Sequence, residues 1–283
     1  MSTPVEEFTV QHEGVSISVS RGGAGQVLVL CPGLTSSRAE LHELIALLRC
    51  AFEVVAFDLR GHGLSSAAQD YSFAALSGDV AAVMTEILRR AVASKPVLVG
   101  HSLGADLLVH YAAQHPDAIG GLVVIDGANP LPAPFITAVD LPELQAMWGA
   151  LGQWRDSLLG TAKQVLLTPR QILDLNLELD VIRSGIDLDI DVVGPGILEQ
   201  YRRIDCPVQL IMSTSMGGDS ARAPRHNRLW RAGVERLVRE RPAITTTWLD
   251  ADHGLVVTHA RQIVDTIGAG FVASARGSGS VQR

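Results

Sequence analysis

The 283-residue sequence has few of the residues that build disulfide-rich, metal-binding, membrane or nucleic-acid-binding proteins. Only three residues are cysteines, and their spacing matches no metal site. No apolar run approaches the roughly 18 residues that a membrane helix needs. Basic residues number 23 against 30 acidic ones, without blocks of like charge, so no phosphate-binding face is expected. We therefore expect no metal, no membrane association and no nucleic-acid partner.

The first residues, MSTPVEEFTV, contain acidic side chains and no apolar stretch of the kind found in secretory signals. Cys31, Cys50 and Cys206 are an odd number of thiols, which does not suit a disulfide framework. We therefore expect a cytoplasmic protein whose cysteines are reduced and lie in or near the core. The chain is rich in apolar residues, with 47% hydrophobic and 19% charged, which is typical of a globular domain.

Short apolar runs alternate with helical patterns along most of the chain. After a predicted hairpin in FTVQHEGVSISVSRGGAGQ, strands are expected over 26–33, 52–58, 95–100 and 121–126, with helices over 37–50, 76–92 and 102–116. The same alternation returns with strands over 206–213 and 243–250, a helix over 227–241 and a last helix from near Leu255. This order predicts an α/β fold, a mostly parallel sheet covered by helices on both faces.

The alternation stops between residues 129 and 201, where prolines and helical patterns replace the strands. We interpret this segment as a helical cap over the carboxyl edge of the sheet, where open α/β folds bind ligands. The predicted core domain then comprises residues 1–128 and 202–275. The segment GSGSVQR leads us to expect a disordered tail over 276–283.

The stretch VLVGHSLGADLLVHY, residues 97–111, places a serine where a predicted strand turns into a helix. Gly100 and Gly104 flank Ser102 and relieve the crowding of so sharp a turn, which leaves the hydroxyl exposed above the sheet edge. The first backbone N–H groups of the helix are free to stabilise a negative charge there. The pattern and its context therefore favour Ser102 as a nucleophile.

A serine nucleophile needs a base, and His253 is the best placed of the nine histidines. It follows the last predicted strand in LDADHGL, so it lies at the same carboxyl edge of the sheet as Ser102. The other histidines fit different positions: a loop for His62, a ring pointing away from Ser102 for His101, the surface for His259, and the helix after the elbow for His110 and His115.

These residues resemble the α/β-hydrolase fold, in its capped, single-domain form. The matching motifs cover nearly the whole core: Cys31-Pro-Gly-Leu34, Asp58-Leu-Arg-Gly-His-Gly-Leu-Ser-Ser66, Gly100-His-Ser-Leu-Gly104, Leu122-Val-Val-Ile-Asp126-Gly127 and Asp252-His-Gly254. The resemblance implies an eight-stranded, twisted, mostly parallel sheet and serine-based acyl transfer with no cofactor and no metal. It also implies an oxyanion hole, which we assign to the backbone N–H groups of Leu34 and Leu103. Relatives usually carry His-Gly where this chain has Pro32-Gly33.

The acid partner of His253 does not stand at the position that is usual in the family. In most relatives it follows the strand that Pro207 opens, but the usual spacing falls on Ser215 or Met216. Some relatives place the acid one strand earlier, where Asp126 stands. We favour Asp126, with Asp219 as the alternative. Asp250 and Asp252 are weaker candidates, since both are too close in sequence to His253.

The predicted cap is rich in apolar residues, and its basic residues Arg155, Lys163, Arg170 and Arg183 are scattered. This pattern does not suggest a clamp for a carboxylate or a phosphate. We expect a medium-sized, mostly apolar substrate, with Phe135, Trp148 and Trp154 as candidate pocket residues. Asp106, one turn beyond Ser102, is expected in a cap or a buried hydrogen bond rather than in the pocket.

The expected function is a serine esterase or thioesterase that acts on a small-molecule ester, lactone or thioester, as a monomer or a homodimer. The first alternative is a biosynthetic thioesterase, which would add a carrier protein as partner. A second is a non-hydrolytic enzyme that uses the same residues for cyclisation or carbon–carbon cleavage. The third is a receptor that keeps the pocket but performs no catalysis. Dehalogenases and epoxide hydrolases of this fold need an aspartate where Ser102 stands.

Overall fold

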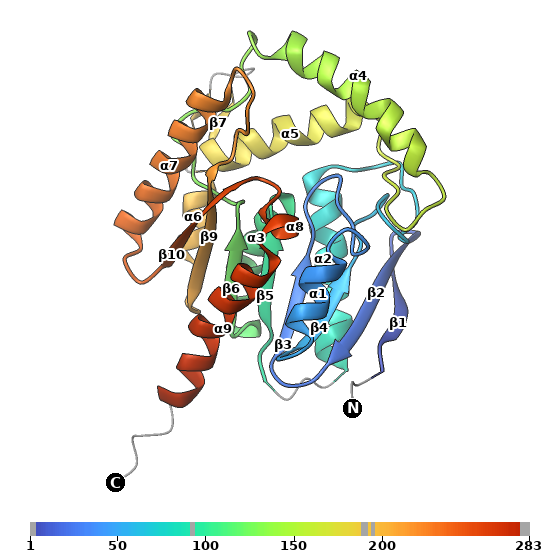
Figure 1. Ribbon diagram of the computed structural model, residues 1–283, viewed down its shortest axis with the longest axis vertical. Coiled ribbons are helices and arrows are strands. Elements are labelled where there is room, and N and C mark those ends of the chain that lie inside the picture. Colours follow the sequence, from blue (N-terminus) through green and yellow to red (C-terminus); the bar gives the residue numbers. More distant parts are fainter. Residues whose placement is uncertain (1–3, 91–93, 188–191, 194–195, 278–283) are drawn as a thin grey trace.

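A computed structural model of the chain describes residues 4–90, 94–187, 192–193 and 196–277, arranged around an eight-stranded sheet (Figure 1). The strand order is β1-β2-β4-β3-β5-β6-β9-β10. The strands are β1 Glu6–His12, β2 Val15–Gly23, β3 Val27–Cys31, β4 Glu53–Phe57, β5 Val97–His101, β6 Gly121–Ile125, β9 Val208–Ser215 and β10 Thr245–Asp252. β1 and β2 form an antiparallel hairpin, β2 is antiparallel to β4, and all the other pairs are parallel. The predicted fold class is confirmed.

Helices cover both faces of the sheet. One face carries α1 His42–Leu48, α8 Leu255–Thr258 and α9 Ala260–Gly277; the other carries α2 Phe73–Arg89, α3 Leu103–Gln114, α6 Ile197–Arg202 and α7 Ala223–Glu240. The single turn η1 Pro116–Ala118 connects α3 to β6. Alternate side chains of β3 enter the two cores, with Val29 in one and Leu28 and Leu30 in the other. The strands appear as unbroken apolar runs because both of their faces are buried.

The segment predicted as the cap contains α4 Leu141–Leu158, α5 Pro169–Ser184 and a small hairpin of β7 Ile186–Asp187 and β8 Val192–Val193. Figure 1 shows α4 and α5 lying across the carboxyl ends of the strands. Thr168 and Gln171 form a reciprocal capping box at the start of α5, and Gly185 ends it in the left-handed conformation. The last helix of the segment, α6, packs instead into the core against α3.

Several predicted boundaries differ by a few residues from the structure, among them those of the helix after β3 and of the last helix. The helix expected over 37–50 is shortened to α1, because the amides of Glu40 and Leu41 both bond to the Ser37 carbonyl in a preceding turn. At the other end of the chain, α9 extends through Gly277, into the segment expected as a disordered tail. Residues 278–283 of that segment lie outside the described residues.

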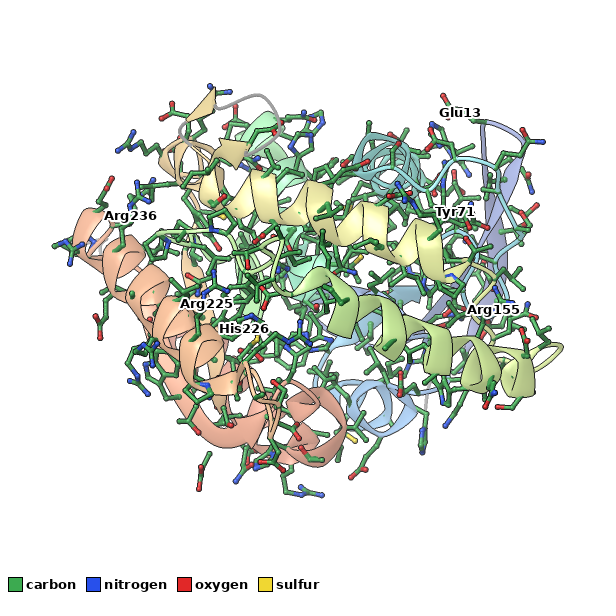
Figure 2. All side chains as sticks on the ribbon, turned by 90° about the horizontal axis from the view of Figure 1, so that it is seen from above. Glu13, Tyr71, Arg155, Arg225, His226 and Arg236 are labelled. Atoms are coloured by element: carbon green, nitrogen blue, oxygen red, sulfur yellow. The ribbon has the colours of Figure 1, made fainter. Side chains whose placement is uncertain are left out.

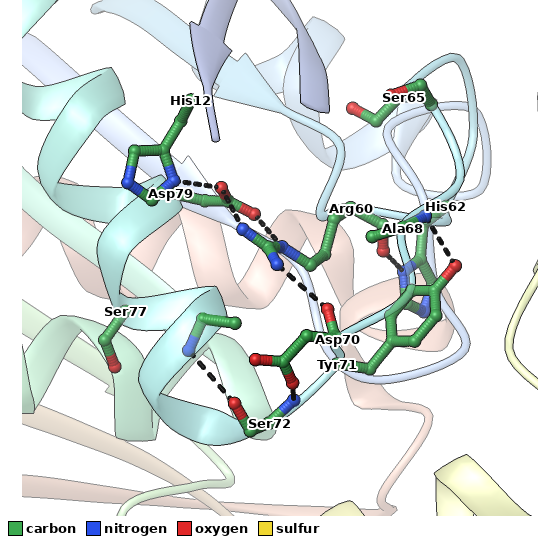
Figure 3. Close-up of polar contacts among 12 residues, drawn as sticks. His12, Arg60, His62, Ser65, Ala68, Asp70, Tyr71, Ser72, Ser77 and Asp79 are labelled. Carbon is green, nitrogen blue, oxygen red and sulfur yellow. Dashed lines mark hydrogen bonds and ion pairs between the residues drawn. The ribbon is translucent and has the colours of Figure 1, made fainter. Parts of the chain in front are cut away.

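Buried charges hold the loop over residues 58–66, which follows β4. Nε and Nη2 of Arg60 donate to the Asp79 carboxylate on α2 at 2.6 and 2.8 Å, and Nη1 donates to the Asp70 carbonyl at 2.9 Å (Figure 3). His12 from β1 bonds to the same carboxylate at 2.8 Å. The hairpin, the loop and α2 are thus joined at one buried carboxylate, so Arg60 braces this loop.

Candidate active site

Ser102 occupies a strained turn between β5 and α3. Its φ of 51° lies in the left-handed region, which non-glycine residues rarely adopt and which is common at functional sites. A Cβ atom at Gly104 would lie 2.3 Å from the Cys31 carbonyl oxygen, and one at Gly100 would lie 2.6 Å from Cα of Ala105. The two glycines therefore let α3 pack against the neighbouring backbone and hold Ser102 at the sheet edge.

Three side chains from different strand ends form one chain of hydrogen bonds. Nε2 of His253, directly after β10, lies 2.9 Å from Oγ of Ser102. Nδ1 of His253 lies 2.8 Å from Oδ2 of Asp126, directly after β6. Asp219, the alternative acid, is exposed in the loop after β9, and the Nδ1 atom that it would bind is bonded to Asp126. The structure thus brings together the three favoured residues.

The Asp126 carboxylate is fully buried and accepts hydrogen bonds from every side. Besides His253, its donors are the amide and hydroxyl of Ser213, at 2.9 and 2.7 Å, and Nε1 of Trp230, at 2.9 Å. Burial raises the pKa of Asp126, but the hydrogen bonds and the charge of His253 outweigh it, so the net pKa lies below the usual value. Ser213 and Trp230 escaped the sequence analysis, because nothing in their local pattern marks them.

His101 lies beside the triad and supports the backbone of His253. Its Nε2 atom is 3.1 Å from the His253 carbonyl oxygen, so the neutral ring donates to that oxygen and points away from Ser102. Its buried Nδ1 atom has no hydrogen-bond partner among the described residues. Burial, followed by the charge of His253, lowers the pKa of His101 to about 3. This side chain therefore stays neutral in the folded protein at neutral pH.

The neutral state of His101 predicts a loss of stability as the pH falls. In the unfolded chain the imidazole binds a proton near pH 6.5, whereas its pKa is about 3 in the folded chain. Because the unfolded state binds more protons between these values, the free energy of unfolding should fall by up to about 1.4 kcal/mol per pH unit from this group. Urea titrations between about pH 7 and pH 5 give the free energy of unfolding at each pH. This free energy should depend less steeply on pH in His101→Gln than in the parent. The same dependence of the unfolding free energy on pH in the variant and the parent would contradict this prediction.

The loop after β3 shapes the expected oxyanion site. Leu34 and Leu103 both line the cavity at Ser102, and Leu103 is the first residue of α3, so its N–H has no acceptor within the helix. Thr35 has a φ of 64°, and its amide donates to Nε2 of His62 at 3.2 Å. Nδ1 of His62 in turn bonds to the Arg60 carbonyl at 2.8 Å. The buried His62, in the loop after β4, thus supports the loop after β3. The chain lacks the histidine that relatives usually carry before Gly33.

A cavity of about 360 Å³ opens at Ser102 and His253, which we call the Ser102 cavity. Its apolar lining consists of Leu34, Leu103, Phe135, Ile136, Leu144, Leu151, Ile172, Leu179 and Met216. Phe135 lines it as expected. Trp154 does not, because its side chain is 41% exposed on the outer surface of α4, and that prediction was wrong. The side chain of Trp148 lies outside the described residues.

The lining is also more polar than the sequence suggested. Thr35, Asn176, Asp180, Arg183, Arg222 and His226 reach the same cavity. Figure 2 shows His226 and Arg225 on the side of α7 that faces the cap helices. His226 stacks on the ring of Phe135, with centroids 4.6 Å apart. The cap arginines were expected to be scattered, but Arg183 on α5 and Arg222 at the start of α7 line the same cavity.

The three cysteines differ in burial, and the described residues form neither a metal-binding group nor a membrane-spanning helix. Cys31 is buried, which raises the pKa of its thiol, and Cys206 is partly buried. Cys50 is exposed at the end of α1, so its expected place in or near the core was wrong. No group of three or more His, Cys, Asp or Glu side chains among the described residues could hold a metal ion. None of the described helices combines the length and apolar character needed to cross a bilayer.

The chain is similar to known proteins over part of its length. The chain is 32% identical over 184 residues to 2-(acetamidomethylene)succinate hydrolase of Mesorhizobium japonicum, a match that covers 65% of this chain and 61% of that protein. It is 38% identical over 111 residues to Protein ABHD8 of Homo sapiens, covering 38% of this chain and 24% of that protein. The matches therefore span less than two thirds of either relative.

Solved structures and a family description extend over more of the chain. The crystal structure of E-2-(acetamidomethylene)succinate hydrolase superimposes with a TM-score of 0.68 at 22% identity, covering 94% of this chain and 99% of that one, which shows a shared fold. Residues 26–178, more than half of the chain, match the family described as the alpha/beta hydrolase fold. The sheet order, the strained serine turn and this match lead to one conclusion: the chain belongs to the α/β hydrolase fold family.

Proposed function

We propose that this protein is a serine hydrolase that cleaves a carboxylic ester, lactone or thioester through an acyl-enzyme on Ser102. The observation that carries the proposal is the continuous hydrogen-bond chain from Ser102 through His253 to the buried Asp126. A serine, a histidine and an acid in this order form the arrangement that activates a hydroxyl for attack on a carbonyl.

The proposed mechanism gives each group of the hydrogen-bond chain a role. His253 Nε2 takes the proton of the Ser102 hydroxyl as its oxygen attacks the substrate carbonyl, and later returns that proton to the leaving group. Asp126 keeps the other ring proton on Nδ1 and stabilises the imidazolium that forms. The amides of Leu34 and Leu103 donate to the oxyanion of the tetrahedral intermediate. Water then attacks the acyl-enzyme with His253 again as the base, which releases the acid.

Three features support hydrolysis over a non-catalytic receptor. The strain at Ser102 is retained, although a binding pocket alone does not need it. The acid is desolvated yet fully bonded; burying a charge costs folding free energy, and a binding pocket alone does not need such a group beside a histidine. The relative from Mesorhizobium japonicum is named as a hydrolase. A cavity of about 360 Å³ suits an acyl group of modest size.

The proposal is tested with p-nitrophenyl esters from acetate to octanoate under single-turnover and steady-state conditions. We expect a burst of p-nitrophenol when acylation outpaces deacylation, and an acyl mass increment on the peptide that contains Ser102. The same measurement with an acyl N-acetylcysteamine thioester separates thioesterase from esterase preference. A folded protein that turns over none of these compounds, and reacts with no fluorophosphonate at Ser102, would refute the proposal.

A further inference from the structure

Arg183 connects the cap to the helix that carries the nucleophile. It lies in the last turn of α5, and its side chain is 10% exposed. Nε and Nη2 donate to the two carboxylate oxygens of Asp106, at 2.9 and 2.5 Å. Asp106 is fully buried in the first turn of α3, directly behind Ser102. The bidentate bond fixes the plane of the guanidinium, which a single contact would not do.

One nitrogen of this guanidinium remains available to a ligand. Nη1 of Arg183 has no hydrogen-bond partner among the residues that the structure describes, and Arg183 lines the Ser102 cavity. The indole ring of Trp230 lies 5.9 Å from the guanidinium carbon, so that neighbour offers a face and no acceptor for Nη1. Nη1 is not one of the buried side-chain atoms that lack a partner, so it is accessible from the cavity that Arg183 lines. A guanidinium donor at a cavity wall can bind an acceptor that arrives with the substrate.

The other charged groups around the cavity favour an anion as that partner. Arg222, at the start of α7, is a second arginine in the lining, with an interaction of its own. The one carboxylate in the lining, Asp180, already accepts the backbone amides of Phe135 and Ile136, both at 2.8 Å. The chain as a whole has a formal net charge of −7, so overall composition does not explain a cavity lined by two arginines.

From this arrangement we infer that Arg183 is a specificity residue and that the substrate carries a carboxylate besides its scissile carbonyl. The inference rests on the proposed serine hydrolase function, because it places this carboxylate in the cavity that opens at Ser102. Asp106 orients Arg183, and Nη1 of Arg183 donates to the substrate carboxylate. The apolar side chains of the cavity then contact the hydrocarbon between the two ends of the substrate.

Matched ester pairs that differ by one charge test this inference. The p-nitrophenyl monoesters of glutaric, adipic and pimelic acid are compared with their ω-methyl esters, after correction for spontaneous hydrolysis. A second pair, 4-acetoxybenzoate and its methyl ester, places the charge on the leaving group. In at least one pair we expect kcat/KM to be about tenfold to hundredfold higher for the carboxylate, the effect of one hydrogen bond between charged groups.

Two variants and one control separate recognition from folding. Arg183→Gln should remove the preference for the carboxylate, so that the ratio of kcat/KM between the two members of each pair falls to about one. Since that change leaves Asp106 buried without its cation, the double variant Asp106→Asn with Arg183→Gln repeats the test without an unpaired charge. The control is Arg170→Gln on the same helix, where the side chain is 77% exposed and pairs with Asp174. Its preference should match that of the parent.

A fluorophosphonate label and a binding measurement keep the two proposals distinct. If Ser102 is labelled in the parent and in every variant, but the parent hydrolyses both members of each pair at equal rates, the role of Arg183 is refuted and the hydrolase proposal still holds. If the parent shows no labelling, calorimetry of Ser102→Ala with monomethyl adipate and dimethyl adipate still decides the role of Arg183. Tighter binding of monomethyl adipate than of the dimethyl ester, lost in Arg183→Gln, would support that role, and equal binding of the two ligands would refute it.

Discussion

Replacement of Ser102 by alanine is expected to lower kcat/KM for the best ester by at least about a thousandfold. In the proposed mechanism the Ser102 hydroxyl forms the acyl-enzyme, and its bond to His253 at 2.9 Å places the base in reach of its proton. Alanine removes one oxygen and keeps the backbone of the turn, so the fold should be retained. Any remaining rate above that of the uncatalysed hydrolysis would come from the oxyanion donors and from substrate binding.

The measurement is a comparison of steady-state rates, fluorophosphonate labelling and thermal unfolding for the parent and Ser102→Ala. Ser77→Ala is the matched control, since Ser77 lies on α2 and its hydroxyl donates to the Phe73 carbonyl, away from the cavity. We expect the control to keep full activity and labelling. Activity that survives in Ser102→Ala at the level of the parent would show that another residue carries the chemistry.

Replacement of Asp126 by asparagine is expected to lower kcat by about ten-thousandfold with the fold retained. The asparagine carbonyl can still accept from the Ser213 amide and from Trp230 Nε1, which both bond to Oδ1 of Asp126. The amide nitrogen would face His253 Nδ1, where it can only donate, so the ring would hold its proton on Nε2. In that tautomer His253 cannot accept the Ser102 proton.

Asp219→Asn provides the comparison, because Asp219 is the alternative acid and lies after β9, three residues or more beyond the position usual in the family. Its side chain is exposed after β9, so we expect rates within a few-fold of the parent. Circular dichroism and urea titration of both variants will show whether each remains folded. The reverse outcome, in which Asp219→Asn inactivates the protein and Asp126→Asn does not, would refute Asp126 as the partner of His253.

The order of elements could be predicted from the sequence because it depends on local chemistry. Continuous apolar runs marked the buried strands, and the glycines around Ser102 marked a turn that only small residues allow. Parallel strands present their carboxyl ends at one edge, so Ser102, Asp126 and His253 could be expected near one another from their positions after three strands. Asp126 and Asp219 both follow strands that end at this edge, so the sequence favoured Asp126 but could not decide between the two.

What the sequence alone determined was therefore the fold class and a short set of candidate residues at one sheet edge. Only the tertiary structure paired His253 with Asp126, added Ser213 and Trp230 around that carboxylate, and joined Arg183 to Asp106. These contacts link residues that are far apart in the chain, so no local pattern records them. Whether a side chain such as Trp154 faces a cavity or solvent likewise depends on how one helix rests on another, and that packing is decided by the whole fold.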